Sequence, residues 1–146
     1  MKIRVAVEAD VQQIAALLAD DTLGASRERP GDPVYFTAFA HMAEQPGNVV
    51  LVAEDGATLI GCLQYTLIHG LSRAGTSRAQ VEGVRVHKDH RGKGVGEKLV
   101  EAAINHARAD GAKLVQLTTD ISREDAKRFY ERLGFTATHW GMKLPL

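Results

Sequence analysis

A strand pattern that runs into a glycine-rich turn at the start of a helix is the feature of this sequence that most restricts its fold. Residues 81–86 (VEGVRV) have the strand pattern, and residues 91–96 (RGKGVG) make up the turn. Glycines let backbone N–H groups approach an anion without obstruction by a Cβ atom. The start of the following helix adds unpaired N–H donors and the positive end of the helix dipole. Together with the charges of Arg91 and Lys93, the pattern favours a diphosphate ligand, and the alternative is a tight turn with a purely structural role.

The rest of the sequence predicts a mixed α/β fold in which helices cover both faces of one sheet. We expect strands where apolar residues cluster or alternate, at residues 3–7, 48–54, 58–68, 79–86, 113–118 and 135–144. Helical spacing of apolar residues predicts helices at 11–18, 34–43, 95–108 and 122–133. The remaining signals are a hairpin turn at Asp55-Gly56, a helix end at Gly134, polar loops at 20–32 and 70–77, and capping boxes at Asp10/Gln13 and Ser122/Asp125.

Length and composition predict one domain over residues 1–146 and exclude several protein classes. The 18 Lys and Arg residues balance the 18 Asp and Glu residues, which argues against a dedicated nucleic-acid-binding protein. No apolar run approaches the roughly 20 residues that span a bilayer, and the N-terminus lacks the apolar segment of a secretory signal. The single cysteine, Cys62, excludes an internal disulfide framework. We therefore expect a cytoplasmic protein with neither a nucleic-acid nor a membrane partner.

Two common phosphate-binding motifs do not match the spacing of the turn. The loop of nucleoside triphosphatases needs Ser or Thr after its lysine, where this chain has Gly94, and a dinucleotide fingerprint needs a third glycine where Leu99 stands. The pattern Arg91-x-x-Gly94-x-Gly96 instead resembles the acetyl-CoA motif Q/R-x-x-G-x-G/A of the GCN5-related N-acetyltransferase (GNAT) family. The order of the expected elements and the block at residues 126–135 (AKRFYERLGF) resemble the same family, so that the resemblance covers essentially the whole chain.

This resemblance implies the GNAT fold, a central, mostly antiparallel twisted sheet with helices on both faces. It also implies transfer of an acetyl group from acetyl-CoA to a primary amine of a small molecule or a protein, with CoA as the product. Backbone groups of Gly92–Gly96 would bind the diphosphate of CoA, and Val84 and Val86 would hold the pantetheine arm between splayed fourth and fifth strands. The cofactor-binding residues expected on this basis are Val84, Arg85, Val86, Arg91, Gly92, Lys93, Gly94, Val95 and Gly96.

Two residues are candidates for the proton transfers of such a reaction. Strict alternation would place Glu82 on the same strand face as Val84 and Val86, and a carboxylate among apolar neighbours suits a general base near neutral pH. The alternative for Glu82 is a structural ion pair with Arg85 or Arg78. By family resemblance Tyr130 is the general acid that assists the departing thiolate, and the alternative is a packing tyrosine. Arg123 stands where many members of the family have asparagine, so we assign it no role.

Other residues give weaker signals. Cys62 lies in an apolar strand and is expected to be a buried, inert thiol, and His87 and His90 lack a third metal ligand, so no metal site is predicted. The acceptor site is expected in the loops at 20–32 and 69–78, where Asp20 and Asp21 would attract a cationic amine and Arg27, Arg73 and Arg78 would hold a carboxylate or phosphate. The alternative is that most of these are solvated loop charges. The acceptor, the acyl-chain preference and the oligomeric state stay open, with a homodimer compatible with the sequence. The alternative functions are a non-catalytic acyl-CoA-binding or regulatory module and a nucleotide-binding α/β protein.

Overall fold

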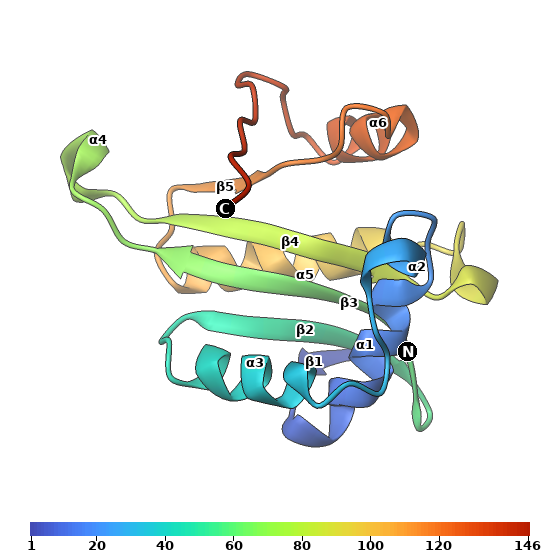
Figure 1. The fold of residues 1–146 in the computed structure, drawn as a ribbon. Helices are drawn as coiled ribbons and strands as arrows, with labels where there is room; N and C mark the ends of the chain where they lie inside the picture. Colours follow the sequence, from blue (N-terminus) through green and yellow to red (C-terminus); the bar gives the residue numbers. More distant parts are fainter. The chain divides into compact units, whose positions relative to one another are not determined.

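Five strands form one sheet in which the strands follow one another in chain order (Figure 1). The strands are β1 (Lys2–Val5), β2 (Asn48–Asp55), β3 (Thr58–Ile68), β4 (Arg78–Val86) and β5 (Leu114–Leu117). Strands β1 to β4 are antiparallel to their neighbours, and the β2–β3 hairpin closes at the predicted turn with Asp55 opposite Thr58. The computed structural model describes all 146 residues and confirms the expected mixed, mostly antiparallel sheet.

Helices cover both faces of this sheet. The helices are α1 (Val11–Ala19), α2 (Gly24–Arg27), α3 (Val34–Ala43), α4 (Ser72–Gly75), α5 (Val95–Ala109) and α6 (Glu124–Arg132). In Figure 1, α1 and α3 lie on the near face of the sheet and α5 lies on the far face. None of these helices is long and apolar enough to cross a membrane.

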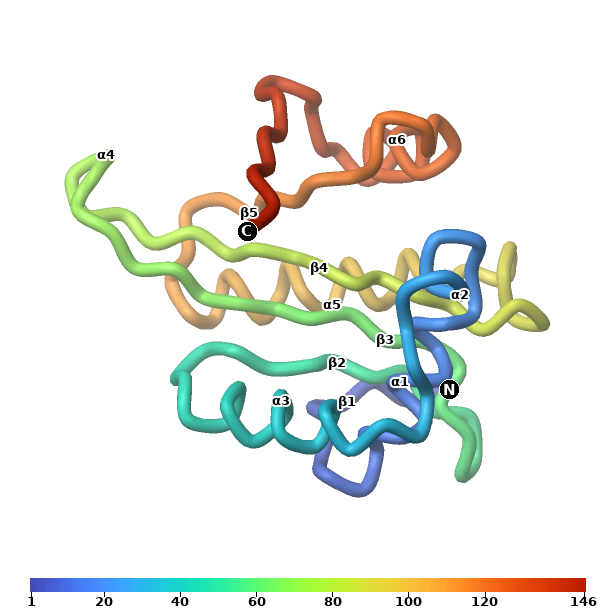
Figure 2. The backbone as a smooth tube through the Cα atoms, in the orientation of Figure 1, coloured from blue at the N-terminus to red at the C-terminus, as the bar shows by residue number.

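The chain forms two compact units, residues 1–116 and residues 117–146. The first unit contains α1 to α5 and nearly all of the sheet, and the second contains α6 and the C-terminal segment. Figure 2 follows the backbone through both units, with the second in orange to red. The single domain expected over residues 1–146 stays a prediction.

Strand β3 is the centre of the core because both of its faces are covered. Cys62 faces the α1 side in a cluster that includes Leu17 and Val52, whereas Tyr65 faces α5 and packs edge-to-face against His106 at 4.8 Å between ring centroids. This double burial explains the nearly continuous apolar run in β3, because both alternating sets of side chains leave water. Gly61 lets α5 approach closely, since a Cβ atom there would lie 2.9 Å from Leu99 Cδ1.

Strand β4 contains one extra residue relative to β3, and this bulge corrects an expectation about Glu82. Gln64 lies opposite Glu82 and Cys62 lies opposite Arg85, so two residues of β4, Gly83 and Val84, stand against one residue of β3. Gly83 has φ +59°, a left-handed conformation that glycine adopts without strain. The prediction that Glu82, Val84 and Val86 share one face by strict alternation is therefore wrong.

Several expected elements differ from those observed. The predicted polar loops contain the one-turn helices α2 and α4, and residues 135–146 form neither helix nor strand, so the last predicted strand is wrong. The apolar residues that suggested this strand include Trp140 and Met142, which are 96% and 91% exposed. Alternation alone cannot create a strand, because its backbone N–H and C=O groups need a partner that the sequence pattern does not identify.

Both predicted capping boxes are also wrong, because other partners take the polar side chains. The Asp10 carboxylate accepts the Val7 N–H at 2.8 Å and pairs with Arg4, which holds the pKa of Asp10 below its ordinary value. Gln13 accepts the Leu59 N–H at 2.9 Å and so ties α1 to the β2–β3 hairpin. The Ser122 hydroxyl donates to the Asp120 carboxylate and does not cap the N-terminus of α6.

Replacement of Gly61 by alanine tests the close approach of α5 to β3. The added methyl group would lie 2.9 Å from Leu99 Cδ1 and 3.0 Å from the Arg85 carbonyl oxygen, so we expect G61A to lower the free energy of unfolding. A loss of about 1–3 kcal/mol is typical of overpacking and is measurable by urea denaturation. Gly70→Ala is the matched control because open space surrounds that position, with the nearest atom 3.9 Å away. Equal effects of the two substitutions would contradict this account of the packing.

Candidate functional site

The glycine-rich turn before α5 faces open space. Gly92 and Gly94 have φ +72° and +79°, so both need glycine for their backbone conformation. A Cβ atom at either position would meet no other atom of the protein within 4 Å, which shows that the turn has an uncovered surface. Helix α5 begins at Val95, and the first N–H groups of a helix have no partner within it. The turn therefore offers backbone donors, the positive end of α5 and the exposed side chain of Lys93 to an anion.

Arg91, the first residue of the predicted motif, is held by the protein itself. Its Nε donates to the Val86 carbonyl oxygen at 3.0 Å, and its Nη2 donates to the backbone carbonyl and the carboxylate of Asp20. The same carboxylate accepts the Lys88 N–H at 2.8 Å. Arg91 therefore links the end of α1 to the segment between β4 and α5, and its charge is already opposed by a carboxylate.

Arg85, near the end of β4, is also held by a carboxylate and a backbone carbonyl. It is 8% exposed, its Nε lies 3.0 Å from Asp21 Oδ2, and its Nη1 donates to the Val84 carbonyl oxygen at 2.9 Å. The Nε–H does not point at the carboxylate, so this contact is an ion pair without an aligned hydrogen bond. Asp20 and Asp21 are thus internal partners of two arginines, which contradicts the expectation that they lie open for a cationic amine.

The last residues of β4 extend beyond the end of β5. Lys113 N–H donates to the Ser77 carbonyl at 2.9 Å, and Gln116 donates to Gln80 at 2.7 Å. Both contacts join residues 36 positions apart, which shows that the two strands advance in the same direction. Because β5 ends at Leu117, the segment from Glu82 to Val86 has no counterpart within β5. The bulged end of β4 is thus not paired with β5.

Glu82 is exposed and stands in a polar strip on the face of the sheet that α1 and α3 also cover. In this strip Gln64, directly opposite Glu82, donates to Asn48 at 2.9 Å, and Thr66 also donates to Asn48. The remaining member is Gln80, opposite Thr66. The apolar surroundings predicted for Glu82 are therefore wrong. So is the alternative of an ion pair with Arg85, whose partner is Asp21.

Tyr130 lies in α6 of the second unit and is half-buried. Its ring packs edge-to-face against Phe129 and Phe135, with centroid distances of 5.0 and 5.8 Å. Gly134 ends the helix as predicted, with φ +91° and with the Phe135 N–H bonded to the Tyr130 carbonyl oxygen at 3.1 Å. This helix end brings Phe135 back onto Tyr130 and restricts the orientation of the tyrosine ring.

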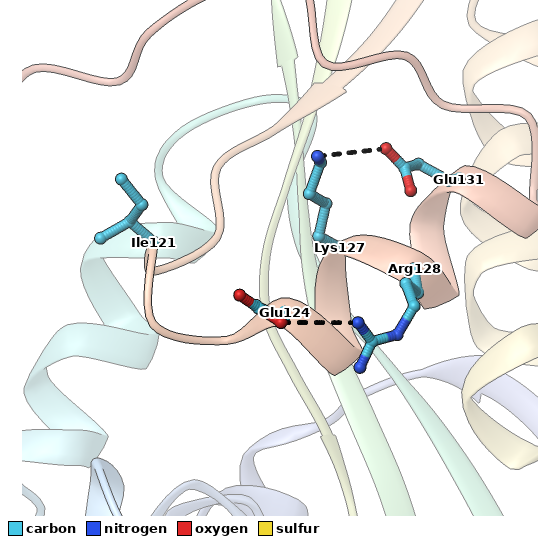
Figure 3. A pocket seen from close by; sticks show the side chains of 5 residues that line it. All are labelled: Ile121, Glu124, Lys127, Arg128 and Glu131. Carbon is cyan, nitrogen blue, oxygen red and sulfur yellow. Dashed lines mark ion pairs between the residues drawn. The ribbon is translucent and has the colours of Figure 1, made fainter.

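The opposite side of α6 carries a shallow charged depression of about 360 Å³ (Figure 3). Its charged residues pair along the helix, with Lys127 3.6 Å from Glu131 and Arg128 3.6 Å from Glu124. Figure 3 shows both pairs between neighbouring turns of the helix. Because each of these charges already has a partner at helical spacing, we interpret this face as a solvated helix surface.

The surroundings of Cys62 and His87 indicate structural roles for both residues. Cys62 is 1% exposed, and burial raises the pKa of its thiol to about 12, which fits the expected inert thiol. The His87 ring accepts the Asp89 N–H at 3.3 Å and stabilises the turn after β4. No group of three or more His, Cys, Asp and Glu side chains is placed to hold a metal ion.

Sequence reasoning missed the roles of Asp20 and Asp21 as partners of the two arginines. Their positions directly after a helix were visible, but Arg85 and Arg91 lie more than sixty residues further along the chain. Nothing in the spacing of charged residues identifies such a pair. The β4 bulge had one available signal, the glycine at position 83 inside a strand pattern.

Comparisons with known proteins agree on one family. Residues 11–135 match the profile of the acetyltransferase (GNAT) family. A crystal structure described as a transcriptional regulator from Bacillus halodurans has 44% sequence identity and a TM-score of 0.95, with 99% of each chain covered. A putative acetyltransferase from Agrobacterium tumefaciens has 25% identity and a TM-score of 0.91, with both chains fully covered. N-alpha-acetyltransferase 30 of Schizosaccharomyces pombe is 29% identical over 104 residues, which are 71% of this chain and 68% of that protein.

Thiol modification tests the burial of Cys62. Burial raises the pKa of the Cys62 thiol to about 12, so little thiolate forms at neutral pH, and a disulfide reagent should react far more slowly with the folded protein than with the urea-unfolded chain. The measurement is the pseudo-first-order rate of colour release in the two states. Similar rates in folded and unfolded protein would show that Cys62 is accessible.

Proposed function

The chain belongs to the acetyltransferase (GNAT) family, and from this premise we propose that it transfers the acetyl group of acetyl-CoA to a primary amine within a ternary complex. The observation that carries the proposal is the uncovered turn at the start of α5, with Gly92 and Gly94 in left-handed conformations and open space around both. Because the family profile covers residues 11–135 of both units, we propose that residues 1–146 act as one domain. The cytoplasmic location stays a prediction.

The residues present fit an acyl-CoA. Backbone N–H groups from Gly92 to Gly96 and the positive end of α5 would bind the diphosphate, with Lys93 adding a full charge. The segment Val84–Val86 would bind the amides of the pantetheine arm through its main chain, and the early end of β5 supports this placement. Acetyl-CoA supplies a thioester, which is an activated acyl donor.

Two side chains are proposed to carry out the proton transfers of the reaction. An alkylamine has a pKa of about 10.4, so it must lose a proton before it attacks a thioester carbonyl. Glu82 is the proposed base, and its exposure in the polar strip supports proton transfer through water. Tyr130 is the proposed acid for the departing sulfur, and its ring is oriented by Phe129 and Phe135. The first amine proton would pass to Glu82, the N–C bond would form, and the C–S bond would break as the thiolate receives the Tyr130 proton. The second proton that leaves the nitrogen would restore the Tyr130 hydroxyl, and Glu82 would release its proton to water.

The polar strip beside Glu82 supports an acceptor that carries neutral hydrogen-bonding groups near its amine. Asn48, Gln64 and Gln80 present amides, which both donate and accept hydrogen bonds and add no charge. Small-molecule amines and peptide amines both offer such groups, and the Schizosaccharomyces pombe relative is named for acetyl transfer to an α-amino group. We propose a primary amine of either source as the acceptor.

A second candidate function is a non-catalytic acyl-CoA-binding or regulatory module. The description of the Bacillus halodurans structure as a transcriptional regulator favours it, since that chain is 44% identical over nearly its whole length. Binding of acetyl-CoA without turnover would distinguish this function from catalysis.

An acceptor screen tests the proposed function. We expect acetyl-CoA to raise the apparent stability of the protein by an amount that grows with its concentration, and we expect free thiol to appear only when a suitable amine is present. The measurements are thermal unfolding with acetyl-CoA, ATP and NAD, followed by thiol release across amino acids, amino sugars, polyamines and peptides. Stabilisation by acetyl-CoA with no thiol release from any amine would support the regulatory module instead.

The two catalytic assignments predict different kinetic defects. Glu82→Gln should lower kcat by about a hundredfold or more at neutral pH, and turnover should then rise with pH as the fraction of free amine grows, because the base is lost. Tyr130→Phe should lower kcat while the Kd of CoA stays close to that of the wild type, because only the acid is lost. Glu101→Gln is the matched control, because it removes an exposed glutamate of α5 that has no part in the proposed site. Unchanged turnover in either catalytic variant would remove that residue from the mechanism.

A further inference from the structure

Two adjacent carboxylates at the end of α1 contact different parts of the proposed cofactor site. Asp20 follows Ala19, the last residue of α1, and Asp21 comes next. Asp20 contacts the segment that leads into the glycine-rich turn, whereas Asp21 contacts the bulged end of β4. Two neighbouring residues after α1 therefore contact the two parts of the proposed site, the glycine-rich turn and the bulged end of β4.

Asp20 fixes the start of the glycine-rich turn at two points. Its Oδ2 accepts the Lys88 N–H at 2.8 Å and lies 3.3 Å from Arg91 Nη2. Arg91 also donates to the Val86 carbonyl at 3.0 Å, so one carboxylate and one guanidinium join α1, the end of β4 and the turn. The location of Arg91 at the C-terminal end of α1 is also favourable for the helix dipole.

This arrangement changes the role of Arg91. The Nε and Nη2 donors of Arg91 bind one carboxylate and two backbone carbonyls inside the protein, so only Nη1 is left to donate to an outside partner. Most donors that can reach an anion are then the backbone N–H groups of the turn and Lys93, and their positions depend on the anchored start of the turn. Asp20 thus acts on the diphosphate through Arg91.

Asp21 holds the bulged end of β4 through Arg85. The Asp21–Arg85 pair is largely buried, with side-chain exposures of 15% and 9%, and Arg85 in turn holds the Val84 carbonyl. The other oxygen of Asp21 accepts the Gly24 N–H. A Cβ atom at Gly24 would lie 1.9 Å from the Leu18 carbonyl oxygen, so only glycine permits this close turn after α1. Asp21 therefore sets the backbone of the bulge along which the pantetheine arm is proposed to bind.

We propose that Asp20 and Asp21 are separate positioning residues, Asp20 for the diphosphate turn and Asp21 for the pantetheine-binding strand. This inference rests on the proposed function, because it presumes that the protein binds an acyl-CoA. If Asp20 affects binding of the diphosphate and Asp21 affects binding of the pantetheine arm, then diphosphate and pantetheine tested as separate ligands should distinguish the roles of the two residues.

The test measures binding of CoA, pantetheine and inorganic diphosphate by NMR titration. Asp20→Asn keeps an acceptor for the Lys88 N–H but loses the charge that holds Arg91. We expect it to weaken CoA and diphosphate about tenfold and to leave pantetheine within about twofold, in line with the loss of one charge-assisted contact. Asp21→Asn should weaken CoA and pantetheine and spare diphosphate. Asp89→Asn removes an exposed carboxylate just before the glycine-rich turn and should leave the binding of CoA, pantetheine and diphosphate unchanged.

Two further variants keep the test decisive. If Asp21→Asn fails to fold, because it leaves Arg85 buried without its partner, the double variant Asp21→Asn/Arg85→Gln removes both charges and should show the same selective loss of pantetheine. If Asp20 acts through Arg91, adding Asp20→Asn to Arg91→Gln should produce little further loss of diphosphate binding. Thermal unfolding of each variant reports whether it is folded.

The opposing outcomes are distinct. Equal losses for all three ligands in Asp20→Asn, or unchanged binding of CoA, would overturn the inference. Tighter CoA binding by Asp20→Asn would also overturn it, because a released Arg91 would then be a direct phosphate ligand. Failure of the wild-type protein to bind CoA would refute the proposed function instead.

Discussion

The extra residue in β4 determines what lies on each side of the sheet near the site. Without the bulge, the register that pairs Gln64 with Glu82 would place Arg85 opposite Gly61, on the side where Leu99 of α5 packs. A guanidinium in that apolar contact would lose its hydration with no carboxylate to compensate. The bulge turns Arg85 to the α1 side, where Asp21 lies 3.0 Å away, so the ion pair and the close packing of α5 depend on the same irregularity.

The packing of α5 in turn determines where its N-terminus lies. Leu99, Val100 and Ala103 are fully buried, and Gly61 admits Leu99 at close range. A helix held in this way by its apolar stripe cannot slide along the sheet without losing buried surface. The glycine-rich turn at its start is therefore placed by the core, and the contact between Arg91 and Asp20 adjusts the turn relative to α1.

Sequence patterns predicted the elements whose own residues specify them. The β2–β3 hairpin followed from Asp55-Gly56, the end of α6 followed from Gly134, and the glycine-rich turn followed from its spacing. The errors arose where partners distant in the chain decide the outcome. Gln13 was assigned to a cap but binds Leu59, and the strand expected at 135–144 lacked a partner strand. Strict alternation predicts apolar neighbours for Glu82, but the backbone leaves the regular pleat at Gly83 and the alternation ends there.

The balanced charge of the chain has a local counterpart that bears on recognition. Asp20 pairs with Arg91 at the turn and Asp21 pairs with Arg85 at the bulge of β4, so the two negative and two positive charges add little net field. What they add is geometry, because each pair fixes a stretch of backbone whose N–H and C=O groups point in defined directions. A site built on fixed backbone donors favours an anion whose oxygens match the directions of those donors. In such a site an arginine of the motif contributes by holding the turn in place, and the net charge of the protein need not be positive.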